Sequence, residues 1–342
     1  METRIGGARR HSLKTCLLLT VSLLVLLHAR PAMPVSGDLQ IPDLGDASSS
    51  LLSSQQEYQL GRGWLMAFRN QAPVIHDPLL SDYLEYLIYN LASFSQLKDR
   101  RIELVVVDNK SMNAFAVPGG VVGVHNGMFL YARNEDQMAS VLAHELAHLS
   151  QRHFARGVEK QKSSSITNLA ALLGALVIAA TAGGDAGLAA ITATQAAAME
   201  SQLRYSRQNE QEADRIGMLT MVNADLDPME VAGMFEEMQR SARYYSRPPE
   251  FLLTHPVTER RISDARSRAS RYPPRKPRDN FEYHLMKARV ELYFEKNVNA
   301  AIKRFRTEIK EDPDYASAHR YGLVLALLKA VRLGEAQQQL DI

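Results

Sequence analysis

Residues 134–150 read NEDQMASVLAHELAHLS, and this stretch predicts the helix around which the rest of the chain is organised. Asn134 is a suitable N-cap, acidic side chains fill the first turn, and apolar residues recur at helical spacing. His144 and His148 stand four residues apart, so both imidazoles lean the same way from the helix axis. We predict a helix that aims two imidazoles at one point and ends by Gly157.

This spacing of histidines is typical of a zinc site in a hydrolase. Glu145 points about 100° to one side, where it could take a proton from a water on the zinc without binding the metal itself. Zinc makes such a water acidic enough to attack a peptide carbonyl near neutral pH. We expect one Zn²⁺ per chain, bound by His144 and His148, with Glu145 as the catalytic base. The alternative, a surface helix with two histidines, is disfavoured by the apolar residues between them.

A catalytic zinc site needs a third ligand from the protein. The metzincin pattern requires glycine and histidine where this chain has Gln151 and Phe154. His153 is one position off, and its side chain is expected to point away from the metal. We therefore expect an acidic ligand on a later helix. The candidates are Glu159, Glu200, Glu210 and Glu212.

Among these candidates, Glu210 has a second acidic residue, Asp214, one helical turn further on. Both side chains would lie on one face of a helix, so Glu210 could bind zinc while Asp214 holds a ligand histidine by its other ring nitrogen. An ordinary solvated, charged helix is the alternative, and the spacing alone does not decide between them.

Upstream of the histidines the pattern predicts two helices and three short strands. One helix starts near Gln55, and Asp77-Pro78 opens the other. The run 101–107 (RIELVVV) is typical of a strand, and 113–117 and 121–124 are typical of two strands joined by a Pro-Gly-Gly turn. We predict a small sheet directly before the helix that carries the histidines.

The strand that begins with Asn113, Ala114 and Phe115 is expected near the metal. Peptidases can bind a substrate as an added strand, through main-chain hydrogen bonds and with little sequence preference. We predict that these three residues bind substrate, which fits the degradation of unfolded chains. The alternative is an internal strand of the sheet.

Downstream, residues 202–270 are predicted to be helical, and 271–279 (RYPPRKPRD) predict a basic, Pro-rich linker. Residues 280–342 predict helical hairpins. Ala288 and Gly322 are 34 positions apart there, which is the period of a tetratricopeptide repeat. The second repeat is incomplete, so we expect its apolar edge to be covered by further chain or by a partner.

The first 36 residues predict a secretory signal, with positive charges, an apolar run and then small residues and prolines. An uncleaved anchor and a mitochondrial presequence are the alternatives. Residues 37–52 predict a flexible leader. The single cysteine, Cys16, lies in the apolar run, so a zinc site in the mature chain must use histidine and carboxylate. The Ala-rich stretch 163–199 predicts two packed helices or, alternatively, a flap or membrane-facing hairpin.

The composition does not indicate a strongly basic surface. The 342 residues carry a formal charge of +2, so nucleic acid is not expected as a partner. The length predicts two domains. We predict a mainly α (α+β) chain, with a helical metallopeptidase domain at 53–270 that contains a small sheet, and a helical tail at 280–342.

Four motifs, in order, resemble the M48 family of zinc metallopeptidases: NAFAVPGGVVGV (113–124), HELAHLSQRH (144–153), SRQNEQEADRIG (206–217) and THPVTERRI (254–262). The resemblance covers about residues 50–270 and implies a gluzincin-type helical fold. It implies that Glu210 is the third metal ligand and that Asp214 supports the site. His255 and Arg261 would lie beside the active site. His255 would then stabilise the oxyanion, or occupy the open position on zinc and hold the enzyme inactive.

Members of this family with a signal segment and a tetratricopeptide tail act in the periplasm on outer-membrane proteins. The resemblance therefore implies a periplasmic endopeptidase for unfolded or misassembled proteins, with a possible chaperone role. The tail would contact the outer-membrane assembly machinery, and peripheral membrane contact is possible. One alternative is a chaperone-like scaffold with a structural zinc. A mitochondrial inner-membrane relative is another, but it would need a spanning helix.

Overall fold

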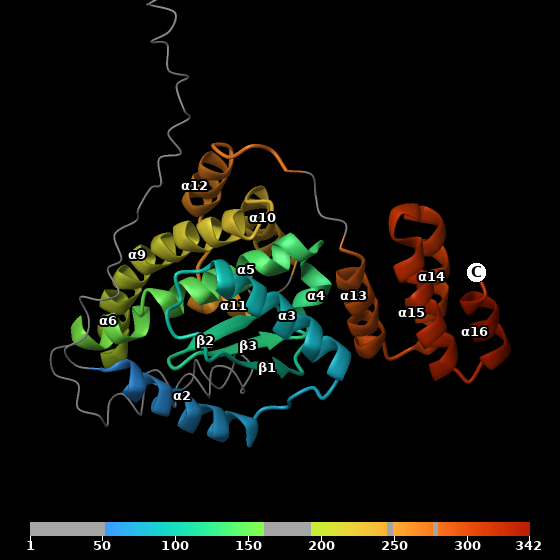
Figure 1. Ribbon diagram of the computed structural model, residues 1–342, viewed down its shortest axis with the longest axis horizontal. Coiled ribbons are helices and arrows are strands. Elements are labelled where there is room, and N and C mark those ends of the chain that lie inside the picture. The colour runs from blue at the N-terminus through green and yellow to red at the C-terminus, as the bar shows by residue number, and fades with distance from the viewer. Residues whose placement is uncertain (1–51, 161–192, 245–248, 276–279) are drawn as a thin grey trace, which may run out of the picture. The chain divides into compact units, whose positions relative to one another are not determined.

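The computed structural model describes residues 52–160, 193–244, 249–275 and 280–342. Helices dominate this part of the chain and one three-stranded sheet lies among them, which confirms the predicted mainly helical α+β class (Figure 1). The first elements are α2 (Ser54–Arg69), α3 (Pro78–Phe94), β1 (Glu103–Val107), β2 (Ala114–Val117), β3 (Val121–His125), α4 (Met128–Tyr131), α5 (Glu135–Ser150) and α6 (His153–Lys160). The later ones are α9 (Ala193–Asn223), α10 (Met229–Tyr244), α11 (Glu250–Thr254), α12 (Glu259–Ala269), α13 (Phe281–Phe294), α14 (Val298–Glu311), the 3₁₀ helix η2 (Pro313–Tyr315), α15 (Ala316–Lys329) and α16 (Leu333–Leu340).

The two predicted N-terminal helices are present and begin at polar caps. The Ser53 hydroxyl accepts a hydrogen bond from the main-chain N–H of Gln56 at the start of α2. The Asp77 carboxylate accepts from two main-chain N–H groups at the start of α3, where Pro78 takes the first position. The apolar side of α3 then packs into the main core of the molecule.

The three predicted strands form one sheet in the order β1-β3-β2. β1 runs parallel to β3, whereas β2 and β3 form an antiparallel hairpin with Ala114 opposite Val124. The hairpin turns through Gly119 and Gly120, both of which have positive φ, so the Pro-Gly-Gly turn supplies the backbone freedom that it needs. β2 is therefore an edge strand of the sheet, and it packs next to α5.

α5 is the centre of the fold, and every residue from Glu135 to Ala147 is buried. It packs against β2 on one side and against α9 and α10 on the other (Figure 1). The Asn134 side chain accepts from the N–H of Gln137, as expected of the N-cap. The predicted end at Gly157 is wrong. α5 ends at Ser150, and α6 runs through Gly157 after a sharp turn.

α9 approaches α5 closely because Gly217 lies at the crossing. A Cβ atom built on Gly217 would meet the main chain of Ala143 and His144 at 3.1 Å. A larger residue would push the helices apart, so the glycine brings this part of α9 against the turn of α5 that carries the histidines.

The last four helices share a small core of their own, while α13 also contributes to the main core through Tyr283, Met286 and Val290. α15 packs against both α13 and α14, and the ring of Phe305 lies over Gly322, where a Cβ would meet it at 2.5 Å. The tetratricopeptide repeat and the domain boundaries stay predictions. The signal segment and the stretch 163–192 lie outside the described residues. Within the described part of the chain, no helix combines the length and apolarity required to cross a bilayer.

Candidate metal centre

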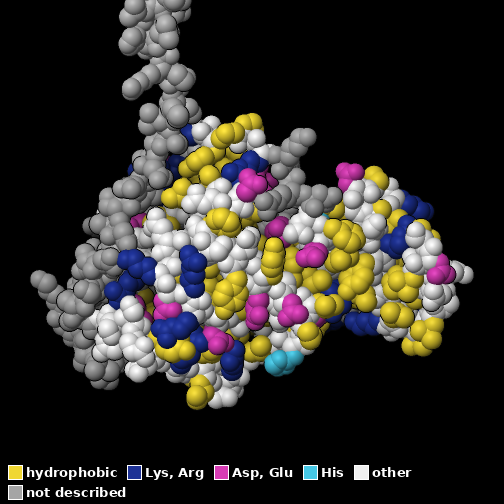
Figure 2. Space-filling view, in the orientation of Figure 1, with side chains coloured by type: hydrophobic (Ala, Val, Ile, Leu, Met, Phe, Trp, Pro, Cys, Tyr) yellow, Lys and Arg dark blue, Asp and Glu magenta, His cyan; other side chains and the backbone are white. Residues whose placement is uncertain are grey.

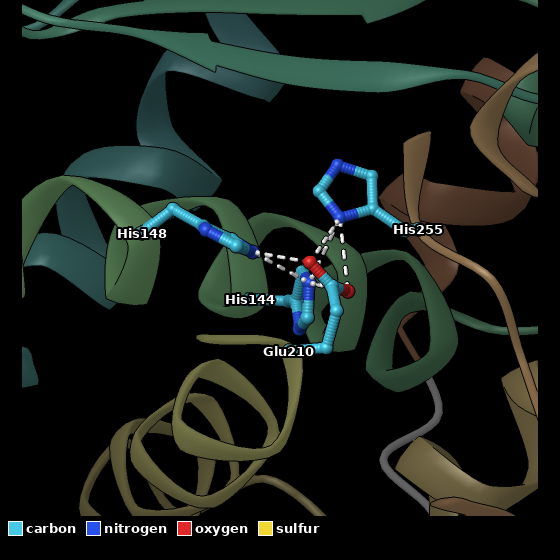
Figure 3. A group of neighbouring side chains, drawn as sticks. All are labelled: His144, His148, Glu210 and His255. Atoms are coloured by element: carbon cyan, nitrogen blue, oxygen red, sulfur yellow. Dashed lines mark hydrogen bonds and ion pairs between the residues drawn. The ribbon is translucent and has the colours of Figure 1, made fainter. Parts of the chain in front are cut away.

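Four side chains from three segments converge on one point (Figure 3). His144 and His148 come from α5, Glu210 comes from α9, and His255 follows α11. The Nε2 atoms of the two α5 histidines are 3.0 Å apart, and each lies 3.3 Å from a carboxylate oxygen of Glu210. His255 Nδ1 lies 3.0 Å from both Glu210 oxygens and 3.4 Å from His144 Nε2.

The distances among His144, His148 and Glu210 are close to those expected around a tetrahedral metal ion. Nitrogen and oxygen ligands at the usual distance of about 2.0–2.1 Å from zinc lie about 3.3 Å from one another in a tetrahedron. Two imidazole nitrogens that face each other at 3.0 Å need a proton or a cation between them, because each neutral ring offers a lone pair there. The set of three imidazoles and one carboxylate is therefore suited to a divalent cation of the zinc type.

The electrostatics of the group favour a cation as well. Burial lowers the pKa of His148 to about 3, so its ring is neutral and able to bind a metal. For His144, burial opposes protonation, but the carboxylates of Asp214 and Glu210 outweigh it and raise the pKa to about 10. Burial alone would raise the pKa of Glu210, yet the imidazoles of His255, His144 and His148 hold it well below its usual value. Two buried carboxylates, Glu210 and Asp214, thus favour positive charge on the imidazoles or between them.

Asp214 and Arg261 support this centre from within the core. The Arg261 guanidinium donates two hydrogen bonds of 2.7 Å to the Asp214 carboxylate, and Asp214 Oδ1 lies 3.1 Å from His144 Nδ1. Arg261 also lies 3.1 Å from Glu210 and donates to the main-chain oxygen of Pro256. The guanidinium thus contacts Glu210, the carboxylate behind His144 and the segment that carries His255.

Glu145 lies beside the centre without belonging to the group of four. Its side chain is 2% exposed, and its Oε1 atom has no hydrogen-bond partner in the described part of the chain. Burial raises the pKa of this carboxyl, although His255 and the main-chain N–H of Ala116 oppose the rise. His255 Nε2 lies 3.6 Å from Glu145 Oε1, so one imidazole contacts both Glu210 and Glu145.

A cavity of about 340 Å³ opens beside Glu145 and His148. The hairpin of β2 forms part of its wall with Phe115, Ala116 and the Pro-Gly-Gly turn. Of the three residues predicted to bind substrate, only Phe115 lines this cavity. Ala114 is fully buried, and the buried Asn113 amide donates to Glu250 instead.

Sequence reasoning missed the roles of His153 and Glu212. His153 lies outside the group of four, and sequence reasoning did not predict that its Nδ1 lies 2.8 Å from Nδ1 of His148, the ring nitrogen that faces away from the group. Glu212, a candidate ligand, contacts His153 instead of the centre. The side chains of Glu159 and Glu200, the other candidates, lie outside the described part of the structure.

Comparison with known proteins agrees with this centre. Residues 78–269 match peptidase family M48. The beta-barrel assembly-enhancing protease of Escherichia coli is 36% identical over 322 residues, which cover 94% of this chain and 66% of that protein. A Vibrio cholerae relative, which carries the same name provisionally, is 38% identical over 323 residues, 93% of this chain and 66% of its own length. The chain thus spans about two thirds of these relatives.

A more distant relative is the mitochondrial metalloendopeptidase OMA1 of Schizosaccharomyces pombe. It is 31% identical over 180 residues, which cover 53% of this chain and 50% of that protein. The family match covers more than half of the chain and includes every residue of the four-membered group and Glu145. The chain therefore belongs to peptidase family M48.

Proposed function

We propose that the chain is a zinc-dependent endopeptidase of the bacterial periplasm that cleaves unfolded or misassembled proteins, including outer-membrane proteins. One observation carries the proposal: His144, His148 and Glu210 meet at one point beside the buried carboxylate of Glu145. The names of the bacterial relatives support the substrate class, and the pattern of residues 1–36 supports export.

Each residue of the centre has a distinct part in this proposal. His144, His148 and Glu210 would hold the zinc, which when bound would polarise the scissile carbonyl and make water more acidic. Glu145 would accept a proton from the attacking water and deliver it to the leaving amine. A buried base suits both steps, because burial raises its pKa and so strengthens its hold on the proton.

The substrate would lie along the outer edge of β2. β2 is an edge strand of the sheet. The N–H of Ala116 bonds to the Glu145 carboxylate, so the free edge of β2 faces the base. An extended peptide added there would place its main chain next to the centre and its side chains toward the cavity at Phe115. Recognition by main-chain hydrogen bonds suits substrates that share no sequence.

His255 would occupy the fourth position of the resting centre. Its contacts with Glu210 and Glu145 support this role over oxyanion stabilisation, since the same ring would exclude water from the metal and cover the base. A substrate would have to displace the imidazole before cleavage.

The main test replaces Glu145 by glutamine. We expect Glu145→Gln to lower the rate of casein cleavage about 10²–10⁴-fold, because the change removes the base. One zinc ion per chain should be retained, because no metal ligand is changed. The matched control is Glu237→Gln, the same change in a carboxylate that pairs with Arg133 and Arg240. Full proteolysis in Glu145→Gln would refute the proposal.

A second test concerns the resting state. His255→Ala is expected to increase casein cleavage several-fold, because the fourth position and Glu145 both become accessible. Zinc content, measured by metal analysis, should stay at one per chain, held by the three remaining ligands. Unchanged or lower cleavage would instead favour a role for His255 in stabilising the oxyanion.

The tail formed by α13–α16 supports a second role in binding partners, such as the outer-membrane assembly machinery. Figure 2 shows hydrophobic side chains gathered over this part of the chain, and exposed examples are Tyr293, Leu328, Val331 and Leu333. A scaffold with a structural zinc would keep its handling of client proteins in Glu145→Gln, so the same variant separates the two functions.

A further inference from the structure

His148 uses both of its ring nitrogens. Nε2 faces the centre, at 3.0 Å from His144 Nε2 and 3.3 Å from Glu210, and Nδ1 lies 2.8 Å from Nδ1 of His153. The two rings are nearly perpendicular and their centroids are 4.7 Å apart. One imidazole thus stands directly behind another.

The contact continues to a carboxylate. His153 Nε2 lies 3.1 Å from Glu212 Oε2, and the same oxygen accepts a hydrogen bond of 2.9 Å from Arg156. His153 and Arg156 lie on the first turn of α6, and Glu212 lies on α9, two residues after Glu210. The His153 side chain is 4% exposed, and those of Glu212 and Arg156 are 15% and 19% exposed.

Only one arrangement of protons satisfies this series while His148 binds a cation. The Nε2 lone pair of His148 is free for the metal only if its proton is on Nδ1, which then donates to His153 Nδ1. His153 must therefore carry its own proton on Nε2, where it donates to Glu212. The Glu212 carboxylate can only accept, and the Arg156 guanidinium holds it in place.

A strained turn brings His153 to this position. Arg152 has a φ of +51°, which few residues other than glycine adopt, and it turns the chain between α5 and α6. Its side chain donates to the Glu57 carboxylate and to the main-chain oxygen of Leu52. The start of α2 and the residue Leu52 before it thus stabilise the turn that puts His153 behind His148.

We propose that His153, Glu212 and Arg156 form a positioning relay that fixes the tautomer and ring direction of His148. None of the three belongs to the metal-binding group, so they act on the metal through His148. This inference rests on the proposed zinc site. A plain ion pair that ties α6 to α9 is the competing explanation.

The test measures the zinc dissociation constant of the full chain by competition with a chromogenic chelator. Glu212→Gln should weaken zinc binding about 10–100-fold, because an amide can donate to His153 and so permits the wrong tautomer. Glu237→Gln is the matched control, since its carboxylate is also 15% exposed and also has two side-chain partners, Arg133 and Arg240. It should bind zinc as the unchanged chain does.

Two variants of His153 separate positioning from packing. His153→Gln keeps one acceptor and one donor, whereas His153→Phe fills similar space without either. The relay predicts that His153→Gln binds zinc more tightly than His153→Phe does. Equal zinc affinity of the two variants would contradict it.

The melting temperature of each chain in excess chelator shows the structural contribution alone. The relay predicts that, in this metal-free state, Glu212→Gln and Glu237→Gln have similar melting temperatures. A lower melting temperature of Glu212→Gln, combined with unchanged zinc affinity, would show that Glu212 only forms an ion pair between two helices. That result would overturn the relay but leave the proposed function standing. If the unchanged chain itself binds no stoichiometric zinc, both the proposed function and the relay fail.

Discussion

The two histidines of α5 are supported in different ways. His144 contacts a carboxylate directly, and that carboxylate forms a double hydrogen bond with the buried guanidinium of Arg261. Nδ1 of His148 is connected to a carboxylate, that of Glu212, only through the imidazole of His153, at the end of α5 where the chain turns. One support lies in the core and the other near the surface.

The two supports differ in burial, and we expect them to differ in how much they affect the stability of the fold and how much they affect the metal site. The Asp214–Arg261 pair holds charges that are nearly excluded from water, so removing one partner should lower the stability of the fold as well as disturb the site. The Glu212–Arg156 pair is partly exposed, so solvent screens it and its main effect should fall on His148. Variants that affect stability and zinc affinity unequally can test this division.

The largest expected effect comes from Asp214→Asn. The change leaves the Arg261 guanidinium, which is 4% exposed, without its main anionic partner. We expect the free energy of unfolding of the metal-free chain to fall by about 3 kcal/mol, the lower end of the range for broken buried pairs, because Arg261 keeps Glu210 and the Pro256 oxygen. Urea denaturation in excess chelator measures this loss.

The comparison variant is Glu212→Gln under the same conditions. Its pair is partly exposed, so the loss should be about 1 kcal/mol or less. Equal losses in Asp214→Asn and Glu212→Gln would remove the distinction between the two supports.

A smaller effect is expected from Gly217→Ala, which acts on the His144 side of the centre. The added methyl would meet the α5 main chain at 3.1 Å, so α9 must shift by a few tenths of an ångström. Strain of about 1–3 kcal/mol is offset by the better helix propensity of alanine, about 1 kcal/mol, so the net loss should be about 0–2 kcal/mol. Urea denaturation measures the loss, and Gly157→Ala, which meets no atom within 4 Å, is the control.

The sequence predicted the parts of the centre that depend on local spacing. The cap at Asn134, the helix that carries the two histidines and the three strands before it all follow from patterns a few residues long. Glu210 and Asp214 were identified as a pair one turn apart, although resemblance to a family was needed to choose Glu210 among the acidic residues. Arg261 and His255 came from the same resemblance.

The position of His153 could not be predicted, because it depends on contacts between distant segments. Arg152 gives no sequence signal for a positive φ, and its side chain is held by Glu57 and Leu52, about 100 residues earlier. The same turn ends α5 before Gly157, which explains the wrong helix end. The only available signal for His153 was a third histidine shortly after the HELAH motif.

The position of β2 at the edge of the sheet has a consequence for how substrate proteins would be selected. If a substrate strand adds to β2 as we propose, the enzyme recognises the main chain of the substrate and not its amino-acid sequence. Selection then depends on time: a protein that folds or assembles promptly hides its extended segments, whereas a delayed one keeps presenting them. Such a protease would act as a timer, sparing fast assemblers and removing slow ones without a recognition code.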